Sequence, residues 1–287
     1  LKPAEAEKAL AELSEAGPIS GLTVKPQLPE AGSVAAPTVF EYEAPAYEKG
    51  AKVAVRKAYG DGLAALGKAR SDVFAVDAEV GNSTYTEIFG KAFPERHFQM
   101  FIAEQVMVSV AQGLDVRGHK AFAATFAAFF CRAYDQIRMA AVSRASLRLV
   151  GTHAGVSIGE DGPSQMALED LAMMRSVHTS AVLYPSDAVC AAALIPQMAE
   201  REGISYMRAT REATSVLYGA EESFSIGGSK TLREGTTATV IAAGITLHEA
   251  LEAADKLAGE GVNIRVIDLY SVKPIDAEAV IKAAQET

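Results

Sequence analysis

Acidic, aromatic and glycine-rich segments that could carry chemistry follow one another between residues 98 and 175. In the first, Phe101-Ile102-Ala103-Glu104, a carboxylate follows apolar residues and opens a predicted helix. A carboxylate in apolar surroundings can share a proton with a ring nitrogen of a bound ligand. An acid in the first turn of a helix is also favourable without any function. For Glu104 taken alone, this structural interpretation is the stronger one.

Three phenylalanines, Phe126, Phe129 and Phe130, make up the second segment. Their spacing places them near one face of a predicted helix over 126–145, where core packing is the default. The alternative is a stacking platform for a flat heterocycle, since offset stacking contributes about 0.5–1.5 kcal/mol beyond burial. Their position after a predicted strand favours this alternative, because ligands gather at the carboxyl ends of parallel strands.

The third segment is rich in glycine and holds His153, Asp161 and Gln165. Glycines after a strand are compatible with a flexible crossover, whereas these three side chains would also suit the recognition of a polyol. Arg56, Ser83 and Arg211 lie elsewhere in the sequence, and each alone is compatible with an ordinary surface position.

The segment Gly60-Asp61-Gly62 could suggest the binding of a magnesium diphosphate, which also needs an Asn-Asn pair. The chain has only two asparagines, Asn82 and Asn263, and they are far apart. We therefore interpret the segment as part of a surface helix that tolerates glycine at a cost of about 1 kcal/mol each. The sequence shows neither the spacing of zinc ligands nor a Ser-His-Asp arrangement, so we expect no metal site in this chain.

Alternating strand and helix patterns predict an α/β fold with a parallel sheet covered by helices on both faces. The expected strands are 72–77, 98–102, 121–124, 147–151, 181–184 and 204–208, and the expected helices are 52–68, 104–116, 126–145, 166–175 and 187–201. A helix over 2–15 and a proline-rich stretch predict a linker over residues 1–50. A polar segment at 210–234 predicts a domain boundary. After it, a second strand-helix-strand-helix unit is expected at 238–243, 246–258, 262–269 and 276–284.

Composition and charge limit the partners of the chain. Its 287 residues are enough for two domains, and 49% hydrophobic with 22% charged residues is typical of a soluble globular protein. The net charge of -9 argues against nucleic acid or an anionic membrane as partner, since both would repel the chain. Cys131 and Cys190 lack metal-ligand spacing and indicate small core residues in a reducing compartment, so we expect a cytoplasmic protein.

Taken together, the segments resemble the transketolase family, and its animal-type branch in particular. The motifs run from about Lys52 to the end of the chain: Arg56–Gly60, Asn82–Thr84, Ile102–Gln105, Thr125–Phe130, Asp135–Ala141, Gly155–Met173 and Thr246–Ala250. The resemblance implies a parallel-sheet pyrimidine-binding domain over 51–215 and part of an α/β C-terminal domain over 235–287. The diphosphate-binding domain that precedes them in the family is absent from the matched sequence.

The resemblance also implies thiamine diphosphate as cofactor. Glu104 is similar to the family's catalytic glutamate that hydrogen-bonds the aminopyrimidine, and Phe126 and Phe129 are similar to the aromatic pair that stacks on it. Glu79 stands where the family has an acid near the thiazolium, although aspartate is expected there. The resemblance places the sugar phosphate against Arg56, Ser83, His153 and Arg211. It places the hydroxyl groups against Asp161, with Gln165 where bacterial and yeast relatives have histidine.

On this basis we expect ketol transfer between sugar phosphates, with no activity from this chain alone. The family builds its cofactor site between subunits, which implies a homodimer or a heteromer with a diphosphate-binding subunit that holds Mg²⁺ or Ca²⁺. One alternative is deoxyxylulose-phosphate synthase or the beta-type subunit of a 2-oxo acid dehydrogenase. Another is a non-catalytic scaffold or regulatory partner. Leu1 is not a start methionine, and both ends suggest a trimmed fragment.

Overall fold

The computed structural model describes residues 2–15 and 37–287, which belong to two separate units divided after Ala36. In the first unit, helix α1 (Pro3–Glu15) confirms the predicted N-terminal helix, and none of its residues is buried. Part of the predicted linker, residues 16–36, lies outside the described residues. Among the helices that are described, none has the length and apolarity needed to cross a membrane.

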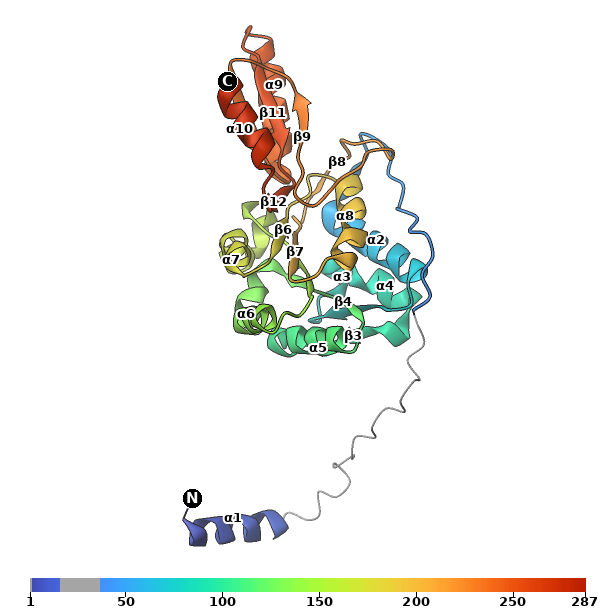
Figure 1. The fold of residues 1–287 in the computed structure, drawn as a ribbon, viewed down its shortest axis with the longest axis vertical. Helices are drawn as coiled ribbons and strands as arrows, with labels where there is room; N and C mark the ends of the chain where they lie inside the picture. Colours follow the sequence, from blue (N-terminus) through green and yellow to red (C-terminus); the bar gives the residue numbers. More distant parts are fainter. Residues whose placement is uncertain (1, 16–36) are drawn as a thin grey trace. The chain divides into compact units, whose positions relative to one another are not determined.

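The second unit contains a sheet of seven strands in the order β12-β6-β7-β5-β4-β2-β3 (Figure 1). Its strands are β2 (Val73–Asp77), β3 (His97–Gln99), β4 (Lys120–Phe126), β5 (Arg148–Thr152), β6 (Ala181–Leu183), β7 (Ser205–Arg208) and β12 (Ser271–Lys273). All neighbouring strands pair in parallel except β12, which runs antiparallel to β6. The predicted α/β fold with a mostly parallel sheet is confirmed.

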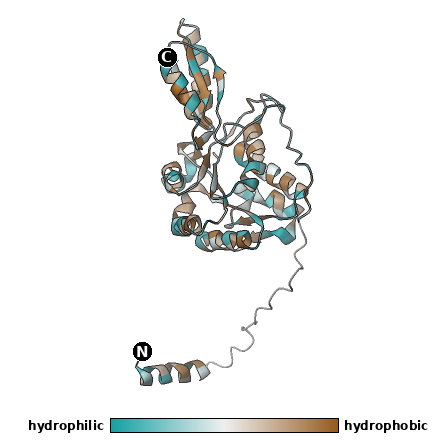
Figure 2. Cartoon of the chain, viewed as in Figure 1, coloured by the Kyte–Doolittle hydropathy of each residue, from teal (hydrophilic) through white to brown (hydrophobic). Residues whose placement is uncertain are grey.

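Helices cover both faces of this sheet and bury one hydrophobic cluster on each. Strand β2 shows the cause, because Val73 and Ala75 belong to one cluster whereas Val76, pointing the other way, belongs to the second. Figure 2 shows hydrophobic residues along the strands and on the helices that flank them. The helices are α2 (Val55–Ala69), α3 (Gly81–Thr84), α4 (Thr86–Ala92), α5 (Glu104–Val116), α6 (Tyr134–Val142), α7 (Asp170–Ser176) and α8 (Ala188–Glu200).

The predicted long helix over 126–145 is wrong. Phe126 is the last residue of β4, with an extended backbone (ψ 142°), and a 3₁₀ helix, η3 (Ala127–Ala133), separates it from α6. Ala127, Phe130 and Ala133 are buried at a spacing of three residues, which matches the three residues per turn of a 3₁₀ helix. The apolar spacing in the sequence therefore does indicate a helix, but this helix is a 3₁₀ helix and not an α-helix.

The start of the predicted helix 52–68 is also different. Residues 52–54 form β1 (Lys52–Ala54), which pairs antiparallel with β8 (Ala213–Ser215). Gly60 and Gly62 lie within α2 as expected, but they are buried and not on the surface. A Cβ on Gly60 would stand 2.5 Å from the Tyr85 carbonyl oxygen, so the glycine allows the 81–86 segment to lie against α2.

The C-terminal part of the second unit has its own sheet, in the order β10-β11-β9. Its elements are β9 (Lys230–Arg233), β10 (Ala238–Ala242), α9 (Ile245–Ala258), β11 (Ile264–Asp268) and α10 (Ala277–Glu286). The predicted strand-helix-strand-helix pattern is present, but the polar segment at 210–234 is not merely a boundary, because it contains β8 and β9. After β11 the chain returns to the large sheet as β12.

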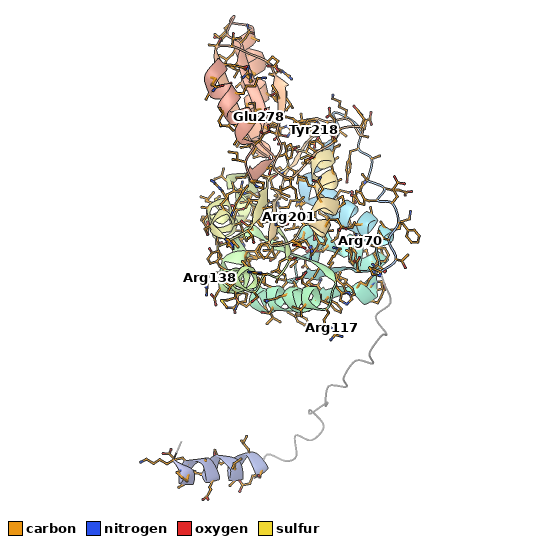
Figure 3. All side chains as sticks on the ribbon, in the orientation of Figure 1. Arg70, Arg117, Arg138, Arg201, Tyr218 and Glu278 are labelled. Atoms are coloured by element: carbon orange, nitrogen blue, oxygen red, sulfur yellow. The ribbon has the colours of Figure 1, made fainter. Side chains whose placement is uncertain are left out.

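A buried acidic cluster joins the two sheets where β11 ends. Asp268 accepts hydrogen bonds from Ser186 Oγ and from the hydroxyl of Tyr218, both at 2.7 Å, and it is fully buried. Tyr218 is labelled in Figure 3. Asp187 accepts from the backbone N–H groups of Leu217 and Tyr218 and also caps α8. Burial raises the pKa of Asp268 to about 6, above its ordinary 3.8.

This pKa predicts a pH-dependent term in stability. Because folding raises the pKa of Asp268, the term favours the folded state at low pH and is lost as the pH rises from 4 to 6. The stability of the wild type, relative to Asp268→Asn, should therefore fall over this range by up to about 3 kcal/mol. Urea unfolding of both proteins from pH 4.5 to 7.5 measures this difference. A difference that does not change with pH would contradict the assignment.

Candidate functional site

All predicted site residues except Arg56, which lies in α2, come where parallel strands end, at the carboxyl edge of the large sheet. Since β2, β3, β4, β5 and β7 all run in the same direction, the segments after them emerge at this one edge. The residues that come after these strands, or end them, are Glu79, Ser83, Glu104, Phe126, Phe129, His153, Asp161, Gln165 and Arg211.

Glu104 is the first residue of α5 and is only 2% exposed. Its Oε2 lies 2.8 Å from Arg132 Nη1, which is the distance of an ion pair. The contact lacks the direction of a hydrogen bond, so Oε2 has no hydrogen-bond donor among the described residues. A buried carboxylate oxygen in this state is costly, and a ligand that donates a hydrogen bond would satisfy it.

Aromatic rings lie close to this edge. The rings of Phe126 and Phe129 stack at 5.1 Å with an interplanar angle of 9°. Phe126 also stacks on the imidazole of His153, at 3.9 Å and 15°. Phe130 is fully buried and meets Tyr206 edge to face, so it serves the core. Phe130 thus serves packing, whereas Phe126 and Phe129 lie at the site edge. Arg132 connects η3, the 3₁₀ helix that holds Phe129 and Phe130, to Glu104.

Two arginines and a histidine form a positively charged group. Arg56 Nε donates to the carbonyl of Arg211 at 3.0 Å, Arg56 Nη1 donates to the carbonyl of Ser83 at 2.6 Å, and its guanidinium lies 5.0 Å from the ring centre of Tyr85. His153 is 3% exposed. Burial, followed by the charges of Arg56 and Arg211, lowers the pKa of His153 to about 4. The imidazole is therefore neutral near pH 7, and the two guanidinium groups supply the charge.

The glycine-rich segment contributes acids to this group. Arg211 Nη1 donates to Glu160 Oε1 at 2.6 Å and to the carbonyl of Ile158 at 3.0 Å. Asp161 Oδ2 lies 3.9 Å from the same nitrogen. The structure therefore brings Arg56, Ser83, His153, Asp161 and Arg211 close to one another, while their roles in binding a sugar phosphate stay predictions.

Two predicted residues are less closely tied to the others. Gln165 lies in the short helix η5 (Pro163–Gln165), where its Oε1 accepts from Ser164 Oγ at 3.0 Å. Glu79 has a left-handed backbone (φ 64°), and its N–H donates to Gln99 Oε1 at 3.1 Å. Within the described residues, neither side chain forms a hydrogen bond or ion pair with the arginine group.

A buried carboxylate that was not among the predicted site residues supports the segment carrying Ser83. Asp77 ends β2 and accepts hydrogen bonds from Val80 N and Thr84 Oγ1, both at 2.7 Å, and from Thr86 Oγ1. These bonds fix the segment that carries Ser83. The available signal was an acid at a strand end followed by two threonines within nine positions. Tyr85, Arg132 and Glu160 were also missed, and no sequence pattern marked them.

The residues fit the pyrimidine part of the implied cofactor. A flat heterocycle needs an aromatic neighbour and a partner for its ring nitrogen, and Phe129 and the unsatisfied Glu104 Oε2 provide both groups at the same edge. Residues 2–15 and 37–287 contain no cluster of three or more His, Cys, Asp or Glu side chains suited to a metal ion. Cys131, expected in the core, is exposed.

Comparison with known proteins decides the family. The profile of the transketolase pyrimidine-binding domain matches residues 51–215, and that of the transketolase C-terminal domain matches residues 227–287. The chain belongs to the transketolase family. Transketolase-like protein 2 of Mus musculus is 48% identical over 269 residues, which cover 93% of this chain and 43% of that protein. Homo sapiens transketolase is 49% identical over 246 residues, which cover 85% of this chain and 40% of that protein.

Solved transketolase structures share this fold. A structure described as a split-gene transketolase, an inactive beta4 tetramer, superposes with a TM-score of 0.76 at 39% identity, covering 83% of this chain and 78% of that one. The transketolase of Leishmania mexicana superposes with a TM-score of 0.74 at 24% identity, covering 82% of this chain and 36% of that one, and supports the fold alone. The chain thus spans less than half the length of the curated relatives named above.

The depressed pKa of His153 gives a direct test of the arginine group. The imidazole should stay neutral down to about pH 4 in the folded state but take up a proton near pH 6.5 in the unfolded state, so the stability falls as the pH drops from 6.5 to 4. A titration of the histidine Cε1–H resonances by NMR measures this, with His153→Gln identifying the signal. Removal of one positive neighbour in Arg211→Gln should move the midpoint upward. An unchanged midpoint in Arg211→Gln would show that this guanidinium does not act on the ring, and a wild-type midpoint near 6.5 would contradict the burial of the ring as well.

Proposed function

We propose that this chain supplies the pyrimidine-binding half of a thiamine diphosphate site and the phosphate-binding end of a sugar site. The reaction would be transfer of a two-carbon ketol unit from a ketose phosphate to an aldose phosphate. One observation carries the proposal. A buried glutamate with an unsatisfied oxygen and a stacked phenylalanine pair follow parallel strands at one edge, and an arginine–histidine group lies against that phenylalanine pair. Membership of the transketolase family supports the same reaction.

Thiamine diphosphate, when bound, supplies the electron sink for breaking and forming the carbon–carbon bond. Glu104 would hold a proton between its Oε2 and a ring nitrogen of the pyrimidine, in a position that solvent barely reaches. Phe129 would stack against the ring, with Phe126 behind it. Arg132 faces Glu104 and would have to leave Oε2 free for this hydrogen bond.

The other end of the site would hold the sugar. Arg56 and Arg211 would bind the phosphate, because forked guanidinium groups form charge-assisted hydrogen bonds with its oxygens. Neutral His153 and the Ser83 hydroxyl would add uncharged hydrogen bonds, and Asp161 and Gln165 would contact the sugar hydroxyls. Glu79 would lie toward the thiazolium. A 2-oxo acid such as pyruvate has no phosphate, so it would leave the arginine group without a ligand.

The proposed activity requires a diphosphate-binding domain in addition to the residues described here, whether on the same polypeptide or another. That domain would hold Mg²⁺ or Ca²⁺ with the diphosphate. A homodimer, or a heteromer with a subunit that carries this domain, would complete the site. The similarity to a split-gene transketolase described as an inactive tetramer supports such an arrangement.

Replacement of Glu104 tests the proposal. The chain is mixed with a diphosphate-binding transketolase subunit, thiamine diphosphate and magnesium, and ketol transfer from xylulose 5-phosphate is measured. Glu104→Gln keeps the shape but cannot hold the proton, so activity should fall by about 10²–10⁴-fold. Glu260→Gln, an exposed acid after α9, is the matched control and should be unaffected.

The same assay separates the alternatives. Turnover of pyruvate without turnover of xylulose 5-phosphate would favour deoxyxylulose-phosphate synthase or an oxo acid dehydrogenase subunit. If the mixture is active but indifferent to Glu104→Gln, this chain is a scaffold or regulatory partner. If the wild-type mixture stays inactive with saturating cofactor and magnesium, the catalytic role is wrong.

A further inference from the structure

The phosphate-binding group already contains an anion that belongs to the chain. Glu160 Oε1 accepts a hydrogen bond from Arg211 Nη1 at 2.6 Å, although the Glu160 side chain is 75% exposed. Within residues 37–287, Glu160 and Asp161 are the only carboxylates within 4 Å of the guanidinium nitrogens of Arg56 or Arg211. Of the two, only Glu160 is at hydrogen-bond distance. The carboxylate therefore stands where a phosphate oxygen would bind Arg211.

The backbone around Glu160 suits a side chain that can be exchanged. Gly159 and Gly162 flank the Glu160-Asp161 pair with φ values of 72° and 82°, and a Cβ on either would meet no atom within 4 Å. Glycine adopts other backbone conformations at low energetic cost. The Glu160-Asp161 pair can therefore move without displacing a packed neighbour. The segment is anchored beside it, because Ile158 is 1% exposed and its carbonyl also accepts from Arg211 Nη1 at 3.0 Å.

The charges on either side explain which ligand would displace Glu160. His153 is neutral near pH 7, so Arg56 and Arg211 carry the positive charge of the group. A carboxylate brings one negative charge to it, whereas a phosphate monoester brings about two near neutral pH. The two arginines therefore bind a phosphate more strongly than they bind the Glu160 carboxylate. A singly charged or neutral group would not bind strongly enough to displace Glu160 from Arg211.

We propose that Glu160 is a specificity-determining residue of the phosphate subsite, which it fills until a doubly charged phosphate takes its place on Arg211. This inference rests on the proposed function, since it assumes that the group binds the phosphate of a sugar. Glu160 does not react with the substrate. Because a ligand must displace Glu160 from Arg211 before it binds, the affinity for phosphate is lower than the two arginines alone would give.

Binding of inorganic phosphate to the full chain tests this without any turnover, because Arg56, Ser83, His153, Glu160 and Arg211 all belong to it. Isothermal titration calorimetry at pH 7.5 and low salt compares the wild type with Glu160→Gln. Loss of an exposed ion pair that competes with the ligand should tighten binding by about 1.5- to 5-fold. A gain in affinity is informative because structural damage would weaken binding.

Two further variants make the result decisive. Glu212→Gln removes the same charge beside Arg211 from a residue with no ion pair to it among the described residues, so it should tighten phosphate binding less than Glu160→Gln does. Arg211→Gln should lose phosphate. Equal gains in the Glu160 and Glu212 variants would indicate a general charge effect and overturn the proposal, as would unchanged or weaker binding in Glu160→Gln. If neither the wild type nor Glu160→Gln binds phosphate, the proposed phosphate subsite itself is wrong, and this inference with it.

Discussion

Parallel pairing in the large sheet is the constraint on which the site depends. Ala124 of β4 pairs with Asp77 on one side and Val150 on the other, and Gly151 of β5 pairs with Arg208. In this register the four strands β2, β4, β5 and β7 end at nearly the same level in the sheet. The chain must therefore leave each strand at the same edge, and segments distant in sequence meet there. A shift of one residue in the pairing of a strand would turn its buried side chains to the opposite face of the sheet. This would disrupt the hydrophobic clusters on both faces.

A buried ion pair and a backbone hydrogen bond fix the glycine-rich segment that follows β5 at this edge. Asp170 accepts hydrogen bonds from Arg208 Nε and from the hydroxyl of Tyr206, and it is fully buried. This ties the far end of the glycine-rich segment to β7, while Ala154 N donates to the Ala209 carbonyl at its near end. A buried charge is tolerable only when it is paired, so neither Asp170 nor Arg208 can leave without a large cost. Glu160 lies between these two contacts and is exposed, so its charge does not need a protein partner.

The sequence was a good guide to the strands and a poorer guide to the segments between them. Buried parallel strands such as 73–77 and 121–124 are nearly continuous apolar runs, so their positions and the fold class could be predicted. Helix α5 starts at Glu104 as expected. The helix over 126–145 failed because a spacing of three or four apolar residues does not separate a 3₁₀ helix from an α-helix. Strand β12 was missed because three residues at the edge of a distant sheet carry no local pattern.

The same limit applied to the site. Residue types suggested Glu104, Phe129 and Arg211, but pairings such as Arg132 with Glu104 depend on how separate segments pack, which no local spacing encodes. The role of each candidate in binding remains a prediction. The structure adds the distances between them.

Backbone conformation shows which parts of the site are fixed before any ligand arrives. Glu79, Tyr85, Phe101 and His153 all have φ between 53° and 64°, and each lies within nine residues after a strand of the large sheet. Such a conformation costs a non-glycine residue roughly 1–3 kcal/mol, so it persists only where surrounding contacts determine it. The three hydrogen bonds to Asp77 and the stacking of His153 on Phe126 are contacts of this kind. Glu160 differs, because the strained positions beside it are glycines. The sheet edge thus combines a rigid frame with one exposed carboxylate, and the proposed exchange of Glu160 for a phosphate would not require that frame to repack.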